Sequence, residues 1–409
     1  MTGKLQAFEV IFDGDDVDVF KSGDVIRGYV KLVLRDAKSD VRGIKISFKG
    51  KAHTHWSEGS GDNRRSYSGY ETYFKEKLVC WGKSKQDVHA TKLTLESGEH
   101  RFPFSFQIPN KPLPFPFESY HGWIRYKVSC KIDRPWKFDH RTERLFTVIG
   151  IPIDLNTMPS ARYPVRDQSS QTVCCLCCAS GPVLTKASTD KSAYVPGESI
   201  FVSGTVENNS SRDIIDLTAK LVQMVVYFST SGHTERRSET MVKVKAPGCG
   251  GGQVALMDWS PLLVPPIPPT GPQGCSIIRI EYYVLFEGDI TNTPFDAEVR
   301  LPVTIGTIPL HQPLYQPSYA DPSAVVLNQP SSNASAPPLP PPCYEVAMGG
   351  PQEIPSKSGY DYTFGKLMYA PQYPTYNLPA SAPTWDPAYP PQQGDTAYPP
   401  SGPGYPPVN

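Results

Sequence analysis

Hydrophobic and polar residues alternate along much of the first 150 residues. In VIRGYVKLVL at 25–34, every second residue from Ile26 to Leu34 is apolar or glycine, and Arg27, Tyr29 and Lys31 lie between them. GIKISFKGKA at 43–52 and WIRYKVSCKI at 123–132 repeat the pattern. A period of two is typical of a strand with one buried face and one solvated face. We therefore predict half-buried strands at these positions.

Helical signals are weak by comparison. No window of similar length carries apolar residues at i, i+3, i+4 and i+7 together with capping residues. The predicted fold class is therefore all-β, with antiparallel strands packed as a sandwich and little helix.

Three patterns occur twice, in the same order. FKSGDVIRGYV from Phe20 matches YVPGESIFVSGTV from Tyr194, WIRYKV around Arg125 matches IIRIEYYV around Arg279, and FTVIGIP before Asp154 matches PVTIGTIP before Leu310. An ordered repeat predicts two copies of one domain. We predict two tandem immunoglobulin-like β-sandwiches at 1–152 and 173–308, joined by a polar, proline-punctuated linker at 153–172.

The composition changes after residue 308. Residues 309–409 contain 24 of the 44 prolines and 11 of the 22 tyrosines, but only 11 Ile, Leu or Val residues. So little aliphatic surface does not offset the entropy lost on ordering. We therefore predict that the whole of 309–409 is a disordered Pro/Tyr-rich tail.

The tail contains one complete Pro-Pro-x-Tyr motif, PPCY at 341–344. Polyproline II has three residues per turn, so Pro341 and Tyr344 share a face with Pro342 beside them. An aromatic groove can accept a proline ring and the tyrosine together, which is how WW domains bind proline-rich ligands. Pro341, Pro342 and Tyr344 are the candidate WW-binding residues, and the alternative is a low-complexity linker. QPSY at 316–319 lacks the first proline, which favours linker there.

Charge is unevenly distributed along a chain whose formal net charge is zero. Residues 1–150 carry 26 Lys and Arg against 19 Asp and Glu, whereas 151–308 carry 12 against 15 and 309–409 carry 2 against 6. A neutral chain argues against a nucleic-acid-binding function. The basic N-terminal domain could face anionic lipid or a phosphorylated peptide tail, or its lysines could simply lie on solvated strand faces.

Four cysteines cluster in CCLCC: Cys174, Cys175, Cys177 and Cys178. One interpretation is the first strand of the second sandwich, with the thiols buried as small hydrophobes. Reversible S-acylation, which would help to hold the protein at a membrane, is the second. A metal or redox site is the third, although four cysteines within five residues are too close for the usual separated pairs of zinc ligands.

Catalytic motifs are missing from the sequence. There is no glycine-rich phosphate loop, no Gly-x-Ser-x-Gly and no His-Glu-x-x-His. His53 and His55 share a strand face but have no third ligand nearby in the sequence. We expect no enzymatic activity, no catalytic residues, no cofactor and no metal. No apolar leader follows Met1, so we expect a cytoplasmic protein.

Several motifs together resemble the arrestin domain-containing proteins, the α-arrestins. They are FKSGD, FESYHGWIRYKV, DRPW, CCLCCASGP, YVPGESI, CSIIRIEYYV and LPVTIGTIPLH, and the resemblance covers residues 5 to about 311. It implies two arrestin-like domains. The tail with its Pro-Pro-x-Tyr motif is also a trait of this family.

The resemblance implies an adaptor function. The arrestin-like domains would bind a membrane cargo, such as a receptor or transporter, and the tail would recruit a HECT-type E3 ubiquitin ligase through its WW domains. Cargo would then be ubiquitinated, internalised and sorted, which implies association with the plasma membrane and endosomes. The alternative is an arrestin-fold sorting or coat-complex subunit that acts without recruiting a ligase.

Overall fold

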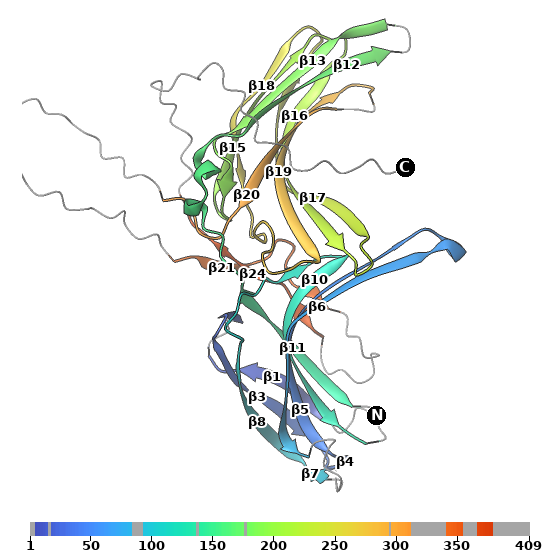
Figure 1. Cartoon of the computed structure of the whole chain (residues 1–409), viewed down its shortest axis with the longest axis vertical. Helices are drawn as coiled ribbons and strands as arrows, with labels where there is room; N and C mark the ends of the chain where they lie inside the picture. Colours follow the sequence, from blue (N-terminus) through green and yellow to red (C-terminus); the bar gives the residue numbers. More distant parts are fainter. Residues whose placement is uncertain are drawn as a thin grey trace, which may run out of the picture.

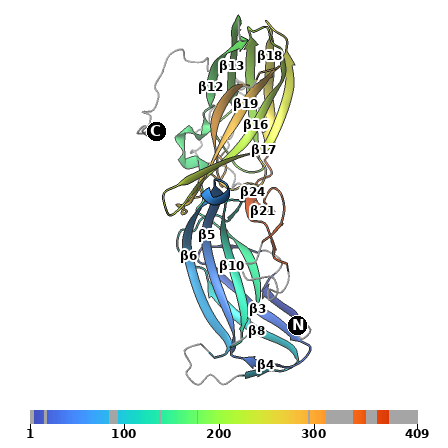
Figure 2. The same cartoon turned by 90° about the vertical axis from the view of Figure 1, so that its right-hand side faces the viewer.

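The computed structural model describes residues 5–14, 18–83, 93–135, 139–175, 178–293, 296–311, 341–354 and 366–378. These residues form two β-sandwiches that stand end to end along the long axis of the molecule (Figures 1 and 2). Within the described ranges there is no α-helix, and hence no helix long and apolar enough to span a bilayer. The prediction of two tandem all-β sandwiches is confirmed.

The N-terminal sandwich packs a three-stranded sheet against a six-stranded sheet. The smaller sheet has the order β1 (Leu5–Phe12), β3 (Val25–Leu34) and β8 (Gly98–Gln107). The larger has the order β2 (Val19–Lys21), β11 (His140–Ile149), β10 (Gly122–Asp133), β5 (Gly43–Glu58) and β6 (Arg65–Gly82), with β9 (Phe117–Glu118) also paired to β10. A short pair, β4 (Lys38–Val41) and β7 (Leu93–Leu95), and the 3-10 turn η1 (Gly61–Asn63) complete this domain.

The C-terminal sandwich repeats this plan with a four-stranded and a five-stranded sheet. The first has the order β12 (Arg166–Cys175), β13 (Cys178–Thr189), β15 (Ser199–Asn208) and β18 (Val254–Leu263). The second has the order β14 (Ala193–Tyr194), β20 (Ala297–Ile305), β19 (Ile278–Ile290), β16 (Ile214–Phe228) and β17 (Thr234–Cys249).

The alternating sequence pattern determines which face of each strand is buried. Along β10, Ile124, Tyr126 and Val128 are buried, and Arg125 and Lys127 between them are half-exposed. The same alternation in facing strands gives a continuous apolar core that includes residues of both sandwiches.

The connection between the sandwiches is shorter than the predicted linker at 153–172. It contains the 3-10 turns η2 (Leu155–Thr157) and η3 (Pro159–Arg162), and β12 already begins at Arg166. β12 is an edge strand of its sheet, and residues 166–168 are exposed. A polar edge strand of this kind looks like a linker in the sequence, because none of the side chains of residues 166–172 is buried.

Two segments of the tail depart from the disorder expected for all of 309–409. Residues 341–354 and 366–378 form β21 (Cys343–Val346), β22 (Gln352–Glu353), β23 (Met368–Tyr369) and β24 (Gln372–Thr375). β21 pairs with β24 and β22 with β23, close to where the two sandwiches meet (Figure 1). The prediction counted only aliphatic residues, whereas these segments bury tyrosine and proline side chains.

Candidate partner-binding site

The WW-binding candidates Pro341, Pro342 and Tyr344 lie just before and within β21. Pro341 is exposed, and Pro342 and Tyr344 are half-buried. β21 runs antiparallel to β24, with Tyr344 opposite Pro374. Proline has no N–H to donate, so this position of the ladder lacks one donor. The motif is therefore partly accessible, and an isolated two-stranded ladder of four residue pairs holds it only weakly.

Three tail tyrosines fix the neighbouring strands to the body. All three side chains are buried, and each hydroxyl donates to a backbone carbonyl oxygen of the sandwiches: Tyr369 to Phe146 at 3.3 Å, Tyr373 to Pro116 at 3.0 Å and Tyr376 to Thr307 at 2.8 Å. Burial raises the pKa of each phenol, so all three stay protonated donors at neutral pH. Buried aromatic rings with satisfied hydroxyls account for the ordering of this segment.

Backbone contacts extend the attachment to both domains. The N–H of Tyr376 donates to the Pro196 carbonyl at 3.0 Å, and the N–H of Met348 donates to the Pro266 carbonyl at 3.1 Å. The N–H of Gln372 donates to Thr147 Oγ1 at 3.2 Å in the N-terminal sandwich. The tail thus bridges the two sandwiches beside the motif.

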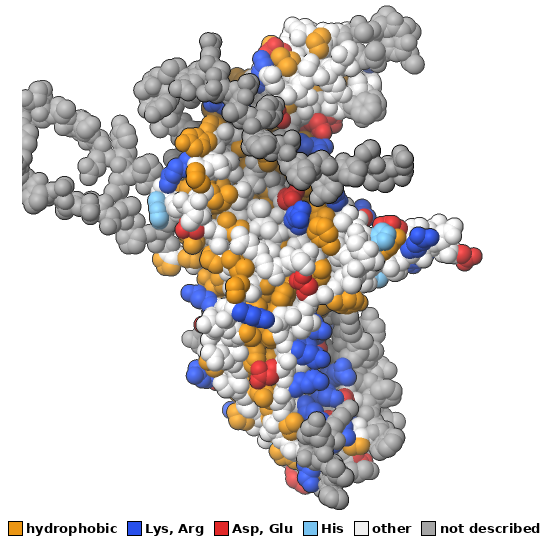
Figure 3. All heavy atoms as spheres, in the orientation of Figure 1, with side chains coloured by type: hydrophobic (Ala, Val, Ile, Leu, Met, Phe, Trp, Pro, Cys, Tyr) orange, Lys and Arg blue, Asp and Glu red, His pale blue; other side chains and the backbone are white. Residues whose placement is uncertain are grey.

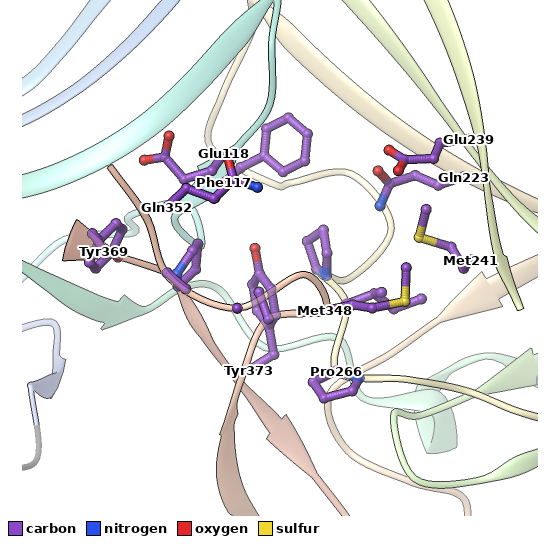
Figure 4. A pocket seen from close by; sticks show the side chains of 16 residues that line it. Phe117, Glu118, Gln223, Glu239, Met241, Pro266, Met348, Gln352, Tyr369 and Tyr373 are labelled. Carbon is purple, nitrogen blue, oxygen red and sulfur yellow. The ribbon is translucent and has the colours of Figure 1, made fainter. Parts of the chain in front are cut away.

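A cavity of about 100 Å³ lies between the tail and the two domains (Figure 4). Tyr373 and Met348 of the tail line it together with Glu118 of β9 and Met241 of β17. The lining combines thioether, aromatic and proline surface with a few polar groups, which suits an apolar side chain better than a charged ligand.

Two of the polar groups that line this cavity, Glu118 and Gln223, already have hydrogen-bond partners. Glu118 accepts two hydrogen bonds from Arg125, at 2.6 and 2.7 Å. Burial raises the pKa of Glu118, and the Arg125 guanidinium opposes that rise. Gln223 Nε2 donates to the Tyr282 hydroxyl at 2.7 Å. These contacts stabilise the sandwich, and among the described residues around the cavity they do not pair a nucleophile with a neighbouring base.

Sequence comparisons identify the two sandwiches. The profile described as "Arrestin (or S-antigen), N-terminal domain" matches residues 8–156, and the one described as "Arrestin (or S-antigen), C-terminal domain" matches residues 179–310. The chain is 32% identical over 321 residues to Arrestin domain-containing protein 17 of Caenorhabditis elegans, covering 75% of this chain and 71% of that protein.

The chain belongs to the arrestin domain-containing (α-arrestin) family. It is also 27% identical over 310 residues to Arrestin domain-containing protein 4 of Homo sapiens, covering 75% of this chain and 72% of the relative. Arrestin domain-containing protein 1 of Mus musculus is 29% identical over 312 residues, covering 76% of this chain and 66% of the relative. The family match ends at residue 310, so the tail contacts lie outside the matched residues.

The cysteine cluster lies at one end of the C-terminal sandwich, far along the chain from the tail. Cys174 is paired in the β12–β13 ladder with Ala179, and Cys175 with Cys178. Cys177 and the side chains of 173–180 lie outside the described residues, so the choice between burial, acylation and a metal or redox site stays open. Elsewhere in the described chain, no three His, Cys, Asp or Glu side chains converge as metal ligands would.

The tail tyrosines are the site residues that sequence reasoning missed. The signal was present in YAPQYPTYNL at 369–378, where three tyrosines fall within eight residues next to two prolines. The incomplete motif QPSY at 316–319 lies outside the described residues.

Proposed function

We propose that this arrestin-family adaptor couples a membrane cargo to a WW-domain HECT-type E3 ubiquitin ligase. The single observation that supports this most is the Pro-Pro-x-Tyr motif at 341–344, placed beside the junction of two arrestin domains with Pro341 exposed. The sandwiches would bind the cargo, a receptor or transporter, and the motif would bring the ligase to it. Ubiquitination would promote endocytosis and endosomal sorting. The protein would work without catalysis, in the cytoplasm and at plasma and endosomal membranes.

The geometry adds a condition to ligase recruitment. A WW domain binds its ligand as polyproline II with the tyrosine ring in a groove. Here Tyr344 is half-buried in a strand paired to β24, so β21 must leave β24 before the ring is free. The apparent affinity of the full chain is therefore reduced by the fraction of molecules in which β21 is open.

Titration of WW domains with the full chain and with a peptide spanning 336–349 tests both points. We expect micromolar binding of the peptide, because a short ligand has few anchors, and weaker binding of the full chain. Tyr344→Ala should abolish binding in both, and Tyr360→Ala in the full chain, at a tail tyrosine with no Pro-Pro before it, serves as the control. Unchanged affinity of Tyr344→Ala would defeat ligase recruitment and favour the coat-subunit alternative.

A further inference from the structure

The outer face of the larger N-terminal sheet carries rows of basic residues. Lys127 of β10 lies opposite Lys49 of β5, and Lys49 lies opposite Lys75 of β6. The next row contains Arg125 and Lys51. Like charges directly opposite each other destabilise a sheet. A row of three lysines across three strands therefore works against stability and calls for a ligand that offsets it.

Some of these cations have acidic partners at the edges of the face. Lys127 pairs with Glu143 at 2.7 Å, and Arg125 pairs with Glu118. Further out, Lys45 pairs with Asp133 and Lys131 with Asp139. The described part of the chain places no such acidic partner beside the lysines at the centre of the face.

Lys49, Lys51, Lys75 and Lys77 make no ion pair with the residues that the structure describes. Burial, followed by the charges of Lys127, Lys51 and Lys75, lowers the pKa of Lys49, and only Glu143 opposes this. Figure 3 shows Lys and Arg side chains gathered along one side of the N-terminal domain. Among the described residues, the positive charge over the middle of β5 and β6 is therefore not compensated.

Two serine hydroxyls lie between the basic rows. Ser129 of β10 is directly opposite Ser47 of β5, and Ser47 is opposite Lys77. Both Oγ atoms are shut off from solvent and have no hydrogen-bond partner among the described residues. A buried hydroxyl without a partner costs free energy, and such a group calls for an explanation. The flexible lysine side chains can move aside and admit a phosphate group. A phosphate oxygen placed between them would accept hydrogen bonds from the hydroxyls of Ser47 and Ser129.

Aromatic and apolar side chains flank the lysines on the same face. Trp123, His53 and Tyr70 form the row beside Arg125 and Lys51, with ring centroids 5.4 Å apart for His53 and Trp123 and 4.5 Å for His53 and Tyr70. Tyr70 is 63% exposed, and Val79, opposite Lys45, is 45% exposed. Trp and Tyr rings favour the boundary between a bilayer and water.

We propose that the outer face of β10, β5 and β6 is a docking surface for the phosphate headgroups of an anionic membrane. Lys49, Lys51, Lys75 and Lys77 supply the charge, Ser47 and Ser129 donate to a phosphate, and Tyr70 and Val79 contact the interface. A sheet face presents these groups as a broad surface rather than a peptide groove, which favours a bilayer over a phosphorylated peptide. Docking here would hold the adaptor beside its cargo.

Vesicle co-sedimentation of the full chain tests this surface. The vesicles contain phosphatidylcholine alone, or with phosphatidylserine, or with a phosphatidylinositol phosphate. We expect binding only to the anionic vesicles, weakening with added salt. Lys49→Gln with Lys75→Gln should lower it about fivefold for each lysine. Lys243→Gln with Arg236→Gln, exposed residues of β17, removes the same charge from the other sandwich and should change it little.

The serines separate a phosphate site from a diffuse charge effect. Ser47→Ala with Ser129→Ala should reduce binding to phosphatidylinositol phosphate about tenfold more than binding to phosphatidylserine, without lowering the unfolding temperature. Equal vesicle binding by the wild type and the Lys49 and Lys75 variant overturns the proposal. So does a wild type that binds a phosphorylated peptide but no vesicle. WW-domain binding is measured separately, so its loss does not bear on this outcome.

Discussion

In both sandwiches a short strand runs parallel to the last strand and ends in a glycine turn. β2 pairs with β11 and β14 with β20, and Gly23 and Gly197 follow with φ of 88° and 89°. In both, a buried tyrosine donates to a proline carbonyl at 2.7 Å: Tyr126 to Pro114 and Tyr282 to Pro268. The duplication has kept the features on which the core depends.

The surfaces of the two sandwiches differ. On the C-terminal sheet that matches the lysine-rich face, Lys220 pairs with Glu287 and Lys245 with Asp216, whereas Lys49 and Lys75 have no such partner among the described residues. The glycine turns after β2 and β14 differ too. The tail residue Tyr376 lies against Gly197, in the turn of the C-terminal sandwich. Packing constrains the core of each copy, and each surface has been free to acquire its own partner.

Substitution of a core glycine should produce the largest effects. A Cβ on Gly28 would overlap the backbone carbonyl of Ile11, and a Cβ on Gly204 would overlap the ring of Phe286. We expect Gly28→Ala and Gly204→Ala each to lower the free energy of unfolding by about 1–3 kcal/mol, with Gly28→Ala the larger because a paired backbone cannot move aside. Urea unfolding of the full chain measures this.

Gly250→Ala is the matched control for both glycines. The nearest atom to its Cβ, Gln253 Oε1, would be 3.4 Å away, which is ordinary contact. Its unfolding midpoint should match that of the wild type. If Gly28→Ala behaves in the same way, β1 and β3 are not packed as closely as described.

Lowering the pH should change the stability of the two sandwiches differently. His140 of β11 is buried 3.0 Å from Lys38, and burial, followed by the charges of Lys38 and Arg134, lowers its pKa to about 4. Because the folded pKa lies below the usual value near 6.5, the N-terminal sandwich should lose about 2 kcal/mol of stability as pH falls from about 6.5 to 4. Hydrogen exchange of β10 and β11 amides across this range measures it, and His140→Gln should abolish the pH dependence.

The stability of the C-terminal sandwich should instead rise as pH falls. Burial raises the pKa of Asp190 and of Glu198, although hydrogen bonds from Tyr194 and Lys191 oppose it. A carboxyl whose folded pKa lies above its unfolded value favours folding more as pH falls through the folded pKa. Amides of β15 and β19 should therefore keep or gain protection where those of β11 lose it. Parallel losses in both domains would contradict this difference.

The paired tyrosines allow a smaller, symmetric test. Tyr126→Phe leaves the Pro114 carbonyl without its donor, which should cost about 1–2 kcal/mol. Tyr282→Phe should cost more, because the Gln223 amide also loses its acceptor. Thermal unfolding of both variants gives the order, and Tyr70→Phe, at an exposed tyrosine, is the control. A larger loss for Tyr126→Phe would mean that Gln223 finds another partner.

Much of the sandwich architecture could be predicted because it depends on residues close together in the sequence. The alternation in 25–34 and 123–132 specifies strands, and the repeat around Gly23 and Gly197 specifies duplication, without knowledge of tertiary contacts. The lysine-rich face needs more, because Lys49, Lys75 and Lys127 become neighbours only through strand register. The sequence reveals an excess of basic residues in the N-terminal domain. Only the cross-strand pairing shows that these lysines share one face of the sheet.

The tail could not be predicted because its order depends on the body. Tyr369, Tyr373 and Tyr376 do not lie in a long apolar run, and an argument from aliphatic content leaves tyrosines out. Their burial depends on carbonyl groups of Phe146, Pro116 and Thr307, which come from distant parts of both sandwiches. For Tyr344, the local motif predicted the WW ligand but not the strand pairing that restrains it.

The smallest change in stability should come from the contact between Tyr376 of the tail and the C-terminal sandwich. Tyr376→Phe removes one hydrogen bond to the Thr307 carbonyl and leaves the ring in place, so the tail should lose about 1 kcal/mol of attachment. Amides of β24 should then exchange about fivefold faster, and the full chain should bind WW domains more tightly, approaching the 336–349 peptide. Tyr70→Phe again serves as the control. Faster exchange without tighter WW binding would mean that β21 opens independently of Tyr376. The contact of Tyr376 with the C-terminal sandwich would then hold the tail without restraining the Pro-Pro-x-Tyr motif.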